Sequence, residues 1–235
     1  MSKLVWDQIG ERLYETGTDH GVLFVQNADG TYANGVAWNG LTAVTESPSG
    51  AEDNPQYADN IKYLNLRSVE EFGGTIEAFT YPDAFGVCDG TIAPTSGLNL
   101  GQQSRRSFGL AYRTLVGNDT EANDHGYKIH LVYGASVSPS EKSYATVNDS
   151  PEPITLSWEF TTTPVSVSTT VGGKTLKPVS CITIDSTKVD ADKLAAFEET
   201  LYGTDGTSGT SSTLPTPDAV IAAFATVSNG NVATT

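Results

Sequence analysis

Carboxylates are the most numerous side chains in this sequence that could do chemistry, with 28 Asp and Glu against 13 Lys and Arg, three His and two Cys. A pair of carboxylates flanking a sugar supplies the acid and the base of glycoside hydrolysis. Glu77 and Glu159 are the best candidates for such a pair, because each stands within a stretch that reads as a strand. On the polar face of a strand, however, a carboxylate is usually only solvated. The sequence therefore indicates an acidic surface rather than an active site.

The histidines and cysteines also argue against metal and nucleophile chemistry. His125 and His130 lie five residues apart, so on one strand their side chains face opposite ways and cannot bind one zinc ion. Cys88 and Cys181 stand among apolar or small residues, outside any CxxC pair, which predicts two buried, reduced thiols and leaves a single disulfide as the alternative. No nucleophile elbow, phosphate-binding glycine loop or dinucleotide fingerprint is present. We expect a protein that is not an enzyme and binds no cofactor and no metal.

Strands predominate among the elements that position these side chains. Pro153 to Thr163 alternates most regularly, with Trp158 and Phe160 on its apolar side, and this period of two predicts a strand buried on one face. Arg105 to Val116 and Gly126 to Val137 predict a hairpin around an acidic turn. Further strands are expected at Val22 to Gln26, Tyr32 to Val44, Ile61 to Leu66, Gly74 to Tyr81 and Val179 to Ile184. The sequence thus predicts a mainly β fold, a β-sandwich or barrel with a flanking α-helix and a long loop.

The chain divides into four expected parts. Residues 1–20 form an N-terminal arm, and residues 21–203 form the β domain, whose helix at about 190–202 is capped by Asp190 and stopped by Gly203. Residues 204–213 form a flexible linker. Residues 214–235 form a short helix that begins at Pro217, followed by a tail expected to be disordered from residue 228. The arm and the short helix are expected to dock on assembly.

The long loop is expected at Glu46 to Asn60. This stretch contains two prolines, a glycine and four acidic residues but no Lys or Arg, so it is too polar to pack and too long for a tight turn. Long loops on compact domains are often functional; a mobile acidic loop without function is the alternative. Ser68 to Glu71 is expected to form a short helical turn, and Pro82 to Leu100 is expected to be irregular.

The net charge of −15 and the isoelectric point near 4.4 limit the partners. Such a charge repels nucleic-acid phosphates, which excludes broad DNA binding but suits a wall past which DNA must slide; solubility alone is the other explanation. No apolar run reaches the roughly 20 residues of a membrane helix, and the N-terminal stretch lacks an apolar signal core. We therefore expect the protein to stay in a cytoplasm or to leave it within a particle. Arg105, Arg106 and Arg113 are the densest basic group, which predicts a subunit contact with acidic loops or ordinary surface solvation.

Several long strings of residues resemble one family. The run GQQSRRSFGLAYRTLVGNDTEANDHGYKIHLVYGASVSPSEKSYATVNDSPEPITLSWEFTTTPV resembles the core of the major tail protein, or tail tube protein, of long-tailed, non-contractile bacteriophages. YLNLRSVEEFGGTIEAFTYPDAFGVCDG is similar to the segment that precedes this core, and DADKLAAFEETLYG followed by LPTPDAVIAAF is similar to the usual ending. The resemblance covers roughly residues 20 to 225.

The resemblance implies a structural subunit without catalytic residues. Such subunits form hexameric rings that stack into a tube, whose acidic lumen conducts DNA from the capsid to the host without binding it specifically. Its partners would be further copies of itself and the tape-measure, tail-tip and tail-terminator proteins, with no membrane. Its location would be the phage tail of the virion, assembled in the host bacterial cytoplasm.

In the family, the loop after the second strand commonly reaches a neighbouring ring. The resemblance therefore assigns the candidate inter-ring residues to the predicted loop, and the candidate lumen residues are Glu77 and Glu159. The inter-ring candidates are Glu46, Glu52, Asp53, Asn54, Gln56, Tyr57 and Asp59.

Two alternatives stay open. One is another virion β-sandwich, for tail completion or capsid decoration, which would form a single closed ring or bind a shell. The other is a carbohydrate-binding module, which would bind as a monomer and expose clustered aromatic residues such as Trp38 and the tyrosines beside paired carboxylates.

Overall fold

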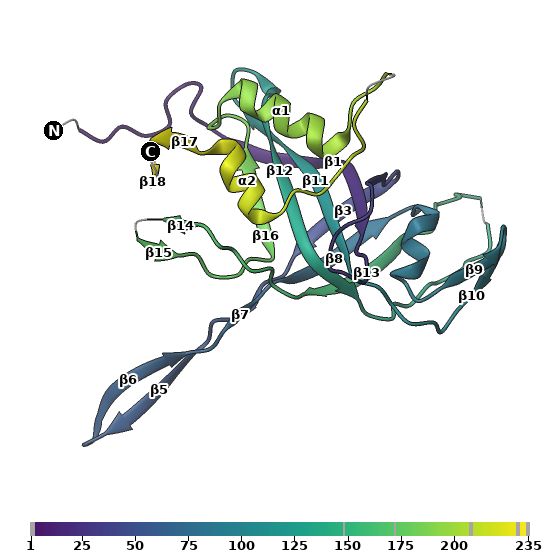
Figure 1. The fold of residues 1–235 in the computed structure, drawn as a ribbon, viewed down its shortest axis with the longest axis horizontal. Helices are drawn as coiled ribbons and strands as arrows, with labels where there is room; N and C mark the ends of the chain where they lie inside the picture. Colours follow the sequence, from purple (N-terminus) through teal and green to yellow (C-terminus); the bar gives the residue numbers. More distant parts are fainter. Residues whose placement is uncertain (1–2, 148, 172, 207–208, 229–230, 234–235) are drawn as a thin grey trace.

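The structure is a computed structural model that describes residues 3–147, 149–171, 173–206, 209–228 and 231–233 (Figure 1). The protein is mainly β, as its sequence predicts, and its largest element is an antiparallel eight-stranded sheet. The strand order is β2-β1-β11-β12-β13-β8-β3, and β16 also pairs with β12. These strands are β1 Tyr14–Val25, β2 Val36–Ala37, β3 Leu41–Glu46, β8 Gly73–Ala78, β11 Phe108–Asn118, β12 Ala122–Val137, β13 Leu156–Thr162 and β16 Cys181–Asp185.

Shorter pairs of strands and three helical segments complete the described chain. The paired strands are β4 Ser49–Gly50 with β7 Glu70–Glu71, β5 Asp53–Ala58 with β6 Ile61–Arg67, β9 Ile92–Thr95 with β10 Leu98–Leu100, β14 Thr170–Val171 with β15 Lys174–Thr175, and β17 Thr226–Ser228 with β18 Asn231–Ala233. The helical segments are the 3-10 helix η1 Asp83–Val87 and the α-helices α1 Ala191–Tyr202 and α2 Pro217–Phe224. None of the helices in the described residues is long and apolar enough to cross a membrane.

Strand β12 gives the sheet its shape. Its Lys128–Val132 portion pairs with β16, whereas its Ala135–Val137 portion pairs with β13. Gly134 lies between the two portions with a φ of +59°, and a Cβ there would stand 2.4 Å from the backbone oxygen of Thr163. Only glycine fits such a position. The sheet divides at this residue, and β13, β8 and β3 fold over β1, β11 and β12 (Figure 1).

Two hydrophobic cores result from this arrangement. The first core lies between the two halves of the curled sheet, and Trp158, Phe160 and Ile76 are among its fully buried members. The second core lies between the other face of β1, β11 and β12 and the two α-helices. Successive residues of β11 therefore alternate between the cores, with Leu110 in the first and Ala111 in the second. A strand buried on both faces is almost continuously apolar, as β11 is.

The helices begin where their capping residues predict. The carboxylate of Asp190 accepts hydrogen bonds from the backbone of Asp192 and Lys193, and α1 ends at Gly203, whose φ is +81°. Burial of Leu194, Phe197 and Leu201 docks α1 on the second core. Thr216 caps α2 in the same way, with Pro217 at its first position. Both helices thus flank one side of the sheet.

Four local predictions are wrong. Strand β1 begins within the expected arm, because Tyr14–Thr16 pair with Leu115–Gly117 of β11. The stretch at Glu46 to Asn60 contains β4 and β5 and is half of a long hairpin. Ser68 to Glu71 contributes β7 to the same hairpin, so it is not helical, and the irregular stretch at Pro82 to Leu100 holds η1, β9 and β10.

Cysteine burial and the C-terminal tail also differ from expectation. Both cysteines are free, but only Cys88 is buried, whereas Cys181 is exposed on the edge strand β16. The tail forms β17 and β18 in its described residues, while residues 229–230 and 234–235 lie outside the described part of the chain. The expected linker is hydrogen-bonded to α1, since Thr213 donates to the Thr200 carbonyl at 3.0 Å and Ser212 Oγ donates to the Leu201 carbonyl at 2.5 Å.

Candidate assembly surfaces

The β5–β6 hairpin extends furthest from the body of the protein (Figure 1). The chain leaves the sheet at Glu46, runs through β4 and β5, and returns through β6 and β7 to Gly73. Asp59 and Asn60 form its turn, with φ values of 51° and 64°. A two-residue turn with both residues in the left-handed region matches the twist of a hairpin, and Asp and Asn tolerate that region better than most residues.

This hairpin carries exposed apolar side chains without any layer to cover them. Leu64 and Leu66 are 40% and 56% exposed, and they stand opposite Gln56 and Asn54 on one face of the ribbon. Tyr57, Tyr63 and Ile61 near the tip are exposed as well. An isolated two-stranded hairpin is at best marginally stable in water. The hairpin is therefore a candidate contact surface.

Six of the seven predicted inter-ring residues lie on this hairpin. Asp53 pairs with Arg67 across the two strands at 2.9 Å, and Asn54 Oδ1 accepts a hydrogen bond from Gln56 at 3.1 Å. Glu52 is exposed beside the hairpin root, and its backbone N–H donates to Ser68 Oγ. Tyr57 and Asp59 are exposed on the β5 strand and at the turn, respectively.

Glu46, the seventh, holds the root of the hairpin to the body. Its carboxylate accepts a hydrogen bond from the Tyr112 hydroxyl at 2.6 Å and lies 3.5 Å from His130 Nδ1. The Tyr112 and His130 rings stack with centroids 4.7 Å apart. Hydrogen bonding to His130 and to Tyr112 keeps the pKa of Glu46 below its usual value despite partial burial. Burial and the neighbouring carboxylate raise the pKa of Tyr112.

Glu77 and Glu159 lie together on the polar face of the β3–β8–β13 layer. Glu77 stands opposite Ser157 and Glu159 stands opposite Thr75, so the two carboxylates are diagonal neighbours on the face away from the first core. Hydroxyl groups surround them on neighbouring strands, among them those of Thr45, Thr75, Ser157 and Thr161. The result is an acidic, hydroxyl-rich sheet face.

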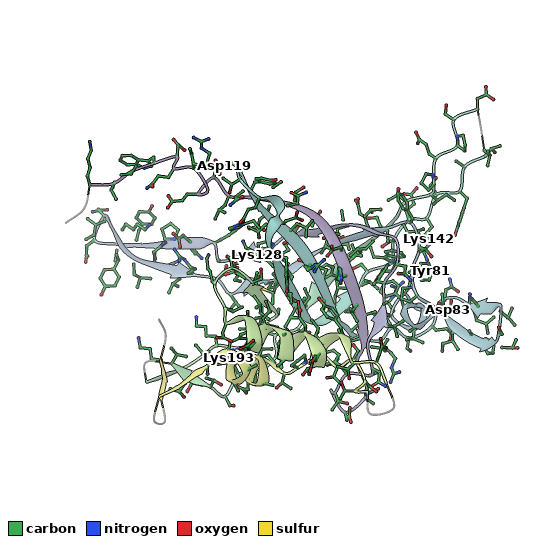
Figure 2. All side chains as sticks on the ribbon, turned by 90° about the horizontal axis from the view of Figure 1, so that it is seen from above. Tyr81, Asp83, Asp119, Lys128, Lys142 and Lys193 are labelled. Atoms are coloured by element: carbon green, nitrogen blue, oxygen red, sulfur yellow. The ribbon has the colours of Figure 1, made fainter. Side chains whose placement is uncertain are left out.

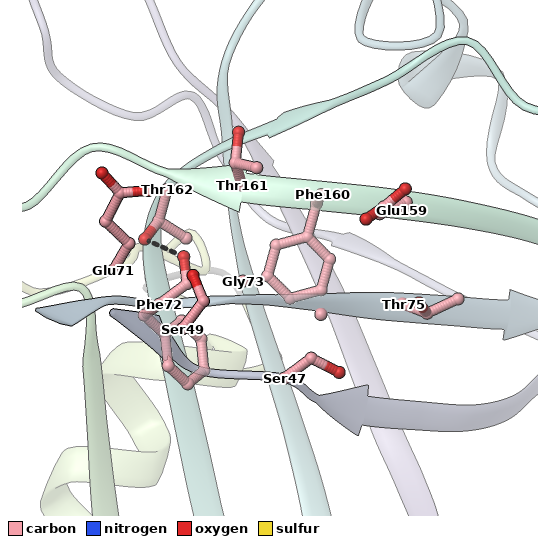
Figure 3. Close-up of a pocket in the computed structure, with 11 residues that line it drawn as sticks. Ser47, Ser49, Glu71, Phe72, Gly73, Thr75, Glu159, Phe160, Thr161 and Thr162 are labelled. Carbon is pink, nitrogen blue, oxygen red and sulfur yellow. Dashed lines mark hydrogen bonds between the residues drawn. The ribbon is translucent and has the colours of Figure 1, made fainter. Parts of the chain in front are cut away.

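A pocket of about 190 Å³ opens on this face at the root of the hairpin (Figure 3). Glu71 and Phe72 line it from the hairpin, and Glu159 and Thr161 line it from β13. The Thr162 hydroxyl donates to the Phe72 carbonyl at 2.7 Å beside it. Glu77 does not line the pocket, so the predicted acid and base pair does not face a common cavity.

Trp38, the tryptophan named for a carbohydrate site, does not lie at this surface. Trp38 and Trp158 are 3% and 0% exposed and pack against each other and Phe85 in the first core. Among the described residues, no group of three or more His, Cys, Asp or Glu side chains is arranged to hold a metal ion. His125 and His130 both lie on β12.

Two of the three predicted contact arginines are engaged within the subunit. Arg113 binds both oxygens of Asp19 at 2.7 and 2.8 Å, and its hydrogen bonds lower the pKa of Asp19. Arg105 lies 3.5 Å from the buried carboxylate of Asp89, which also binds Lys142. Arg106 is exposed and makes no ion pair with any described residue. It is the arginine of the three that is available to a partner.

Two further apolar surfaces are the N-terminal arm, which was expected to dock on assembly, and the β9–β10 hairpin, which was not assigned from the sequence. The arm is fixed at Gly10, whose N–H donates to Asp119 at 2.9 Å, and residues ahead of it such as Trp6 are more than two-thirds exposed. On the β9–β10 hairpin, three apolar side chains are each nearly half exposed to solvent. The sequence feature that could have indicated this hairpin is the Ser96–Gly97 pair, a turn signal between two short strand-like runs. In the structure Gly97 has a φ of +80°, as such a turn requires. The exposed residues of β9–β10 are Ile92, Leu98 and Leu100.

No protein-family model matches the chain, and no curated protein matches it either.

Proposed function

We propose that the protein is the structural subunit of a bacteriophage tail tube, in which copies form hexameric rings that stack around a DNA-conducting lumen. The hairpin carries the proposal: it projects from a body that has two hydrophobic cores of its own, and its apolar side chains, Tyr57, Ile61, Tyr63, Leu64 and Leu66, are 40–71% exposed in the subunit. A protein of this shape gains stability when a second molecule buries that surface. The resemblance to tail tube proteins over most of the chain supplies the identity of the second molecule, which is another copy.

The ends of the sheet support a ring. Among the residues that the structure describes, strand β3 pairs only with β8 and β16 pairs only with β12, so each leaves one edge without a strand partner there. Open edges invite pairing with another chain, and closing the sheets of successive subunits into a ring removes such edges. The acidic face with Glu77 and Glu159 is our candidate for the lumen wall, because carboxylates repel DNA phosphates and let DNA slide.

The proposal is tested by negative-stain electron microscopy and light-scattering mass of the purified protein over a concentration series. We expect rings and hollow tubes for the wild-type protein, and no tubes but at most single rings for the variant L64S/L66S, because the hairpin is placed between rings and the sheet edges within a ring. The matched control T170S, which lies on β14 away from the hairpin, should assemble normally. A single closed ring at every concentration would instead favour a tail-completion protein. Monomers at every concentration, also in the presence of tail-tip proteins, would contradict the proposal.

A further inference from the structure

Two apolar extensions leave the subunit at opposite ends of the same strand. The β5–β6 hairpin leads into β8 at Gly73, whereas η1 and the β9–β10 hairpin follow Ala78 at the other end of β8. Figure 1 shows the tip of β5–β6 and the β9–β10 hairpin at opposite extremes of the long axis. The two surfaces therefore cannot meet within one subunit, but they can meet between successive subunits.

Like the β5–β6 hairpin, the β9–β10 hairpin is a two-stranded ribbon with exposed apolar side chains. In the described part of the chain its two strands pair only with each other, and Ile92, Leu98 and Leu100 are 46%, 49% and 48% exposed. Leu64 and Leu66 offer a comparable apolar surface on β6. Joining the two would remove both surfaces from water at once.

The charges of the two surfaces are complementary. The hairpin and its root, residues 46–71, hold six acidic residues against the two basic residues Lys62 and Arg67. From Gly90 to Arg106, which includes the β9–β10 hairpin, the chain has no acidic residue. Asp83 of η1 lies at the same end (Figure 2), and the buried Asp89 just before this stretch is paired with Arg105 and Lys142. Arg106 is the exposed cation of this acid-free stretch. Opposite potentials bring surfaces together, and like charges keep them apart.

The same charges disfavour the pairing of two hairpins, because two β5–β6 hairpins would place carboxylates against carboxylates. The N-terminal arm lies toward the same end as the hairpin in both views (Figures 1 and 2), and its charges balance, with Asp7 and Glu11 against Lys3 and Arg12. The arm therefore offers the hairpin carboxylates no net positive surface. A contact between opposite ends of identical subunits is heterologous, and it repeats along an axis wherever its rotation does not close into a ring.

We infer that the β5–β6 hairpin of one copy docks on the β9–β10 hairpin of a second copy, with Leu64 and Leu66 against Ile92, Leu98 and Leu100 and with Arg106 facing the hairpin carboxylates. This contact, which rests on the function proposed above, makes β9–β10 the acceptor surface between stacked rings.

Cross-linking from the hairpin identifies its acceptor directly. In a C181S background, which removes the exposed thiol, Q56C, opposite Leu64 on the docking face, is labelled with benzophenone maleimide; Cys88 is fully buried and stays unlabelled. A mixture of isotope-labelled and unlabelled protein separates contacts between copies from those within one copy. After irradiation we expect cross-linked peptides from residues 90–106 of the second copy. Links to the arm or to another hairpin, or no link between copies, would overturn the inference. K174C on β15 is the control probe and should not reach residues 90–106.

A mixing experiment tests the head-to-tail direction. The variant L64S/L66S has an intact acceptor surface but an impaired β5–β6 hairpin, whereas L98S/L100S has an intact β5–β6 hairpin but an impaired acceptor. Both variants should unfold at the wild-type melting temperature, because all four leucines are exposed. Neither variant should form tubes alone, but their mixture should form discrete hetero-oligomers by light scattering. Normal tubes from L98S/L100S would refute the acceptor and leave the proposed function standing. Links to residues 90–106 without rings or tubes would refute the function and leave the contact standing.

Discussion

The Tyr112 hydroxyl donates a 2.6 Å hydrogen bond to the Glu46 carboxylate, although 66 positions separate the two residues in sequence. Glu46 ends β3, where the hairpin leaves the sheet, and Tyr112 lies on β11 at the first core. The bond therefore ties the root of the projecting hairpin to the strand shared by both cores. Its energy should be measurable in the stability of the whole subunit.

Tyr112→Phe removes the hydroxyl and keeps the ring stacked on His130. We expect a loss of about 1–2 kcal/mol in the free energy of unfolding, because the acceptor is a charged carboxylate that is left partly buried. Urea denaturation measures the change. Tyr57→Phe, on the exposed part of the hairpin, is the matched control and should leave the midpoint unchanged. An unaltered midpoint for Tyr112→Phe would show that water replaces the bond at no cost.

Acid should weaken the same contact. The pKa of Glu46 is lower in the folded protein than in the unfolded chain, because His130 and Tyr112 hydrogen-bond to its carboxylate. Its contribution is therefore fully present above the unfolded pKa and is lost as the pH falls through the folded pKa. Comparing wild type with Glu46→Gln in urea at pH 7 and at pH 3 should show a difference in stability that shrinks at pH 3. A difference that grows on acidification would contradict this assignment.

Ala122 occupies the left-handed region in the β11–β12 turn, with a φ of 53°. Glycine adopts this conformation without strain, so Ala122→Gly should raise the free energy of unfolding by about 1 kcal/mol. The exposed helical residue Ala195 provides the opposite case, because Ala195→Gly should lower it by about 1 kcal/mol. Thermal denaturation of the two variants side by side checks both signs. Equal destabilisation by both would mean that the turn carries no strain.

Reversing the charges of Glu77 and Glu159 should change how tubes treat DNA. If their sheet face lines the lumen, tubes of E77K/E159K should retain short duplex DNA at low salt and protect it from nuclease, and the retention should fall steeply with added salt. D192K/E199K makes the same change in charge on α1, outside the β3–β8–β13 layer, and should protect no DNA. Equal protection by both variants would place the lumen on another face.

The sequence predicted those elements whose signals are local. The alternation of apolar and polar residues around Trp158 predicted β13, and the capping residues Asp190 and Thr216 predicted where α1 and α2 begin. The strand β6 was predicted at Ile61 to Leu66, but its partner β5 was missed because the turn between them, Asp59–Asn60, lacks glycine, and because a ribbon that no core covers shows no one-sided pattern. Such a strand reads as a polar loop.

The contacts of the site could not be predicted from spacing. The partners of Glu46 and Arg113 come from strands far apart in the chain, and their meeting depends on the register of the curled sheet. Cys181 was expected inside because its neighbours are apolar or small. In the folded protein Ile182 and Ile184 face the second core, and the alternation of β16 turns Cys181 to the opposite side.

The strand order has a consequence for how the chain is made. β13 is the strand that joins β2-β1-β11-β12 to β8-β3, and it is completed only at Thr162. During synthesis at roughly 5–20 residues per second, the earlier strands therefore emerge from the ribosome as two separate blocks. Until β13 emerges, both blocks expose the edges and apolar faces that the first core later hides. Nascent chains on neighbouring ribosomes are most vulnerable to mispairing in this interval, and a chaperone that acts on this protein has most to protect before the closing strand arrives.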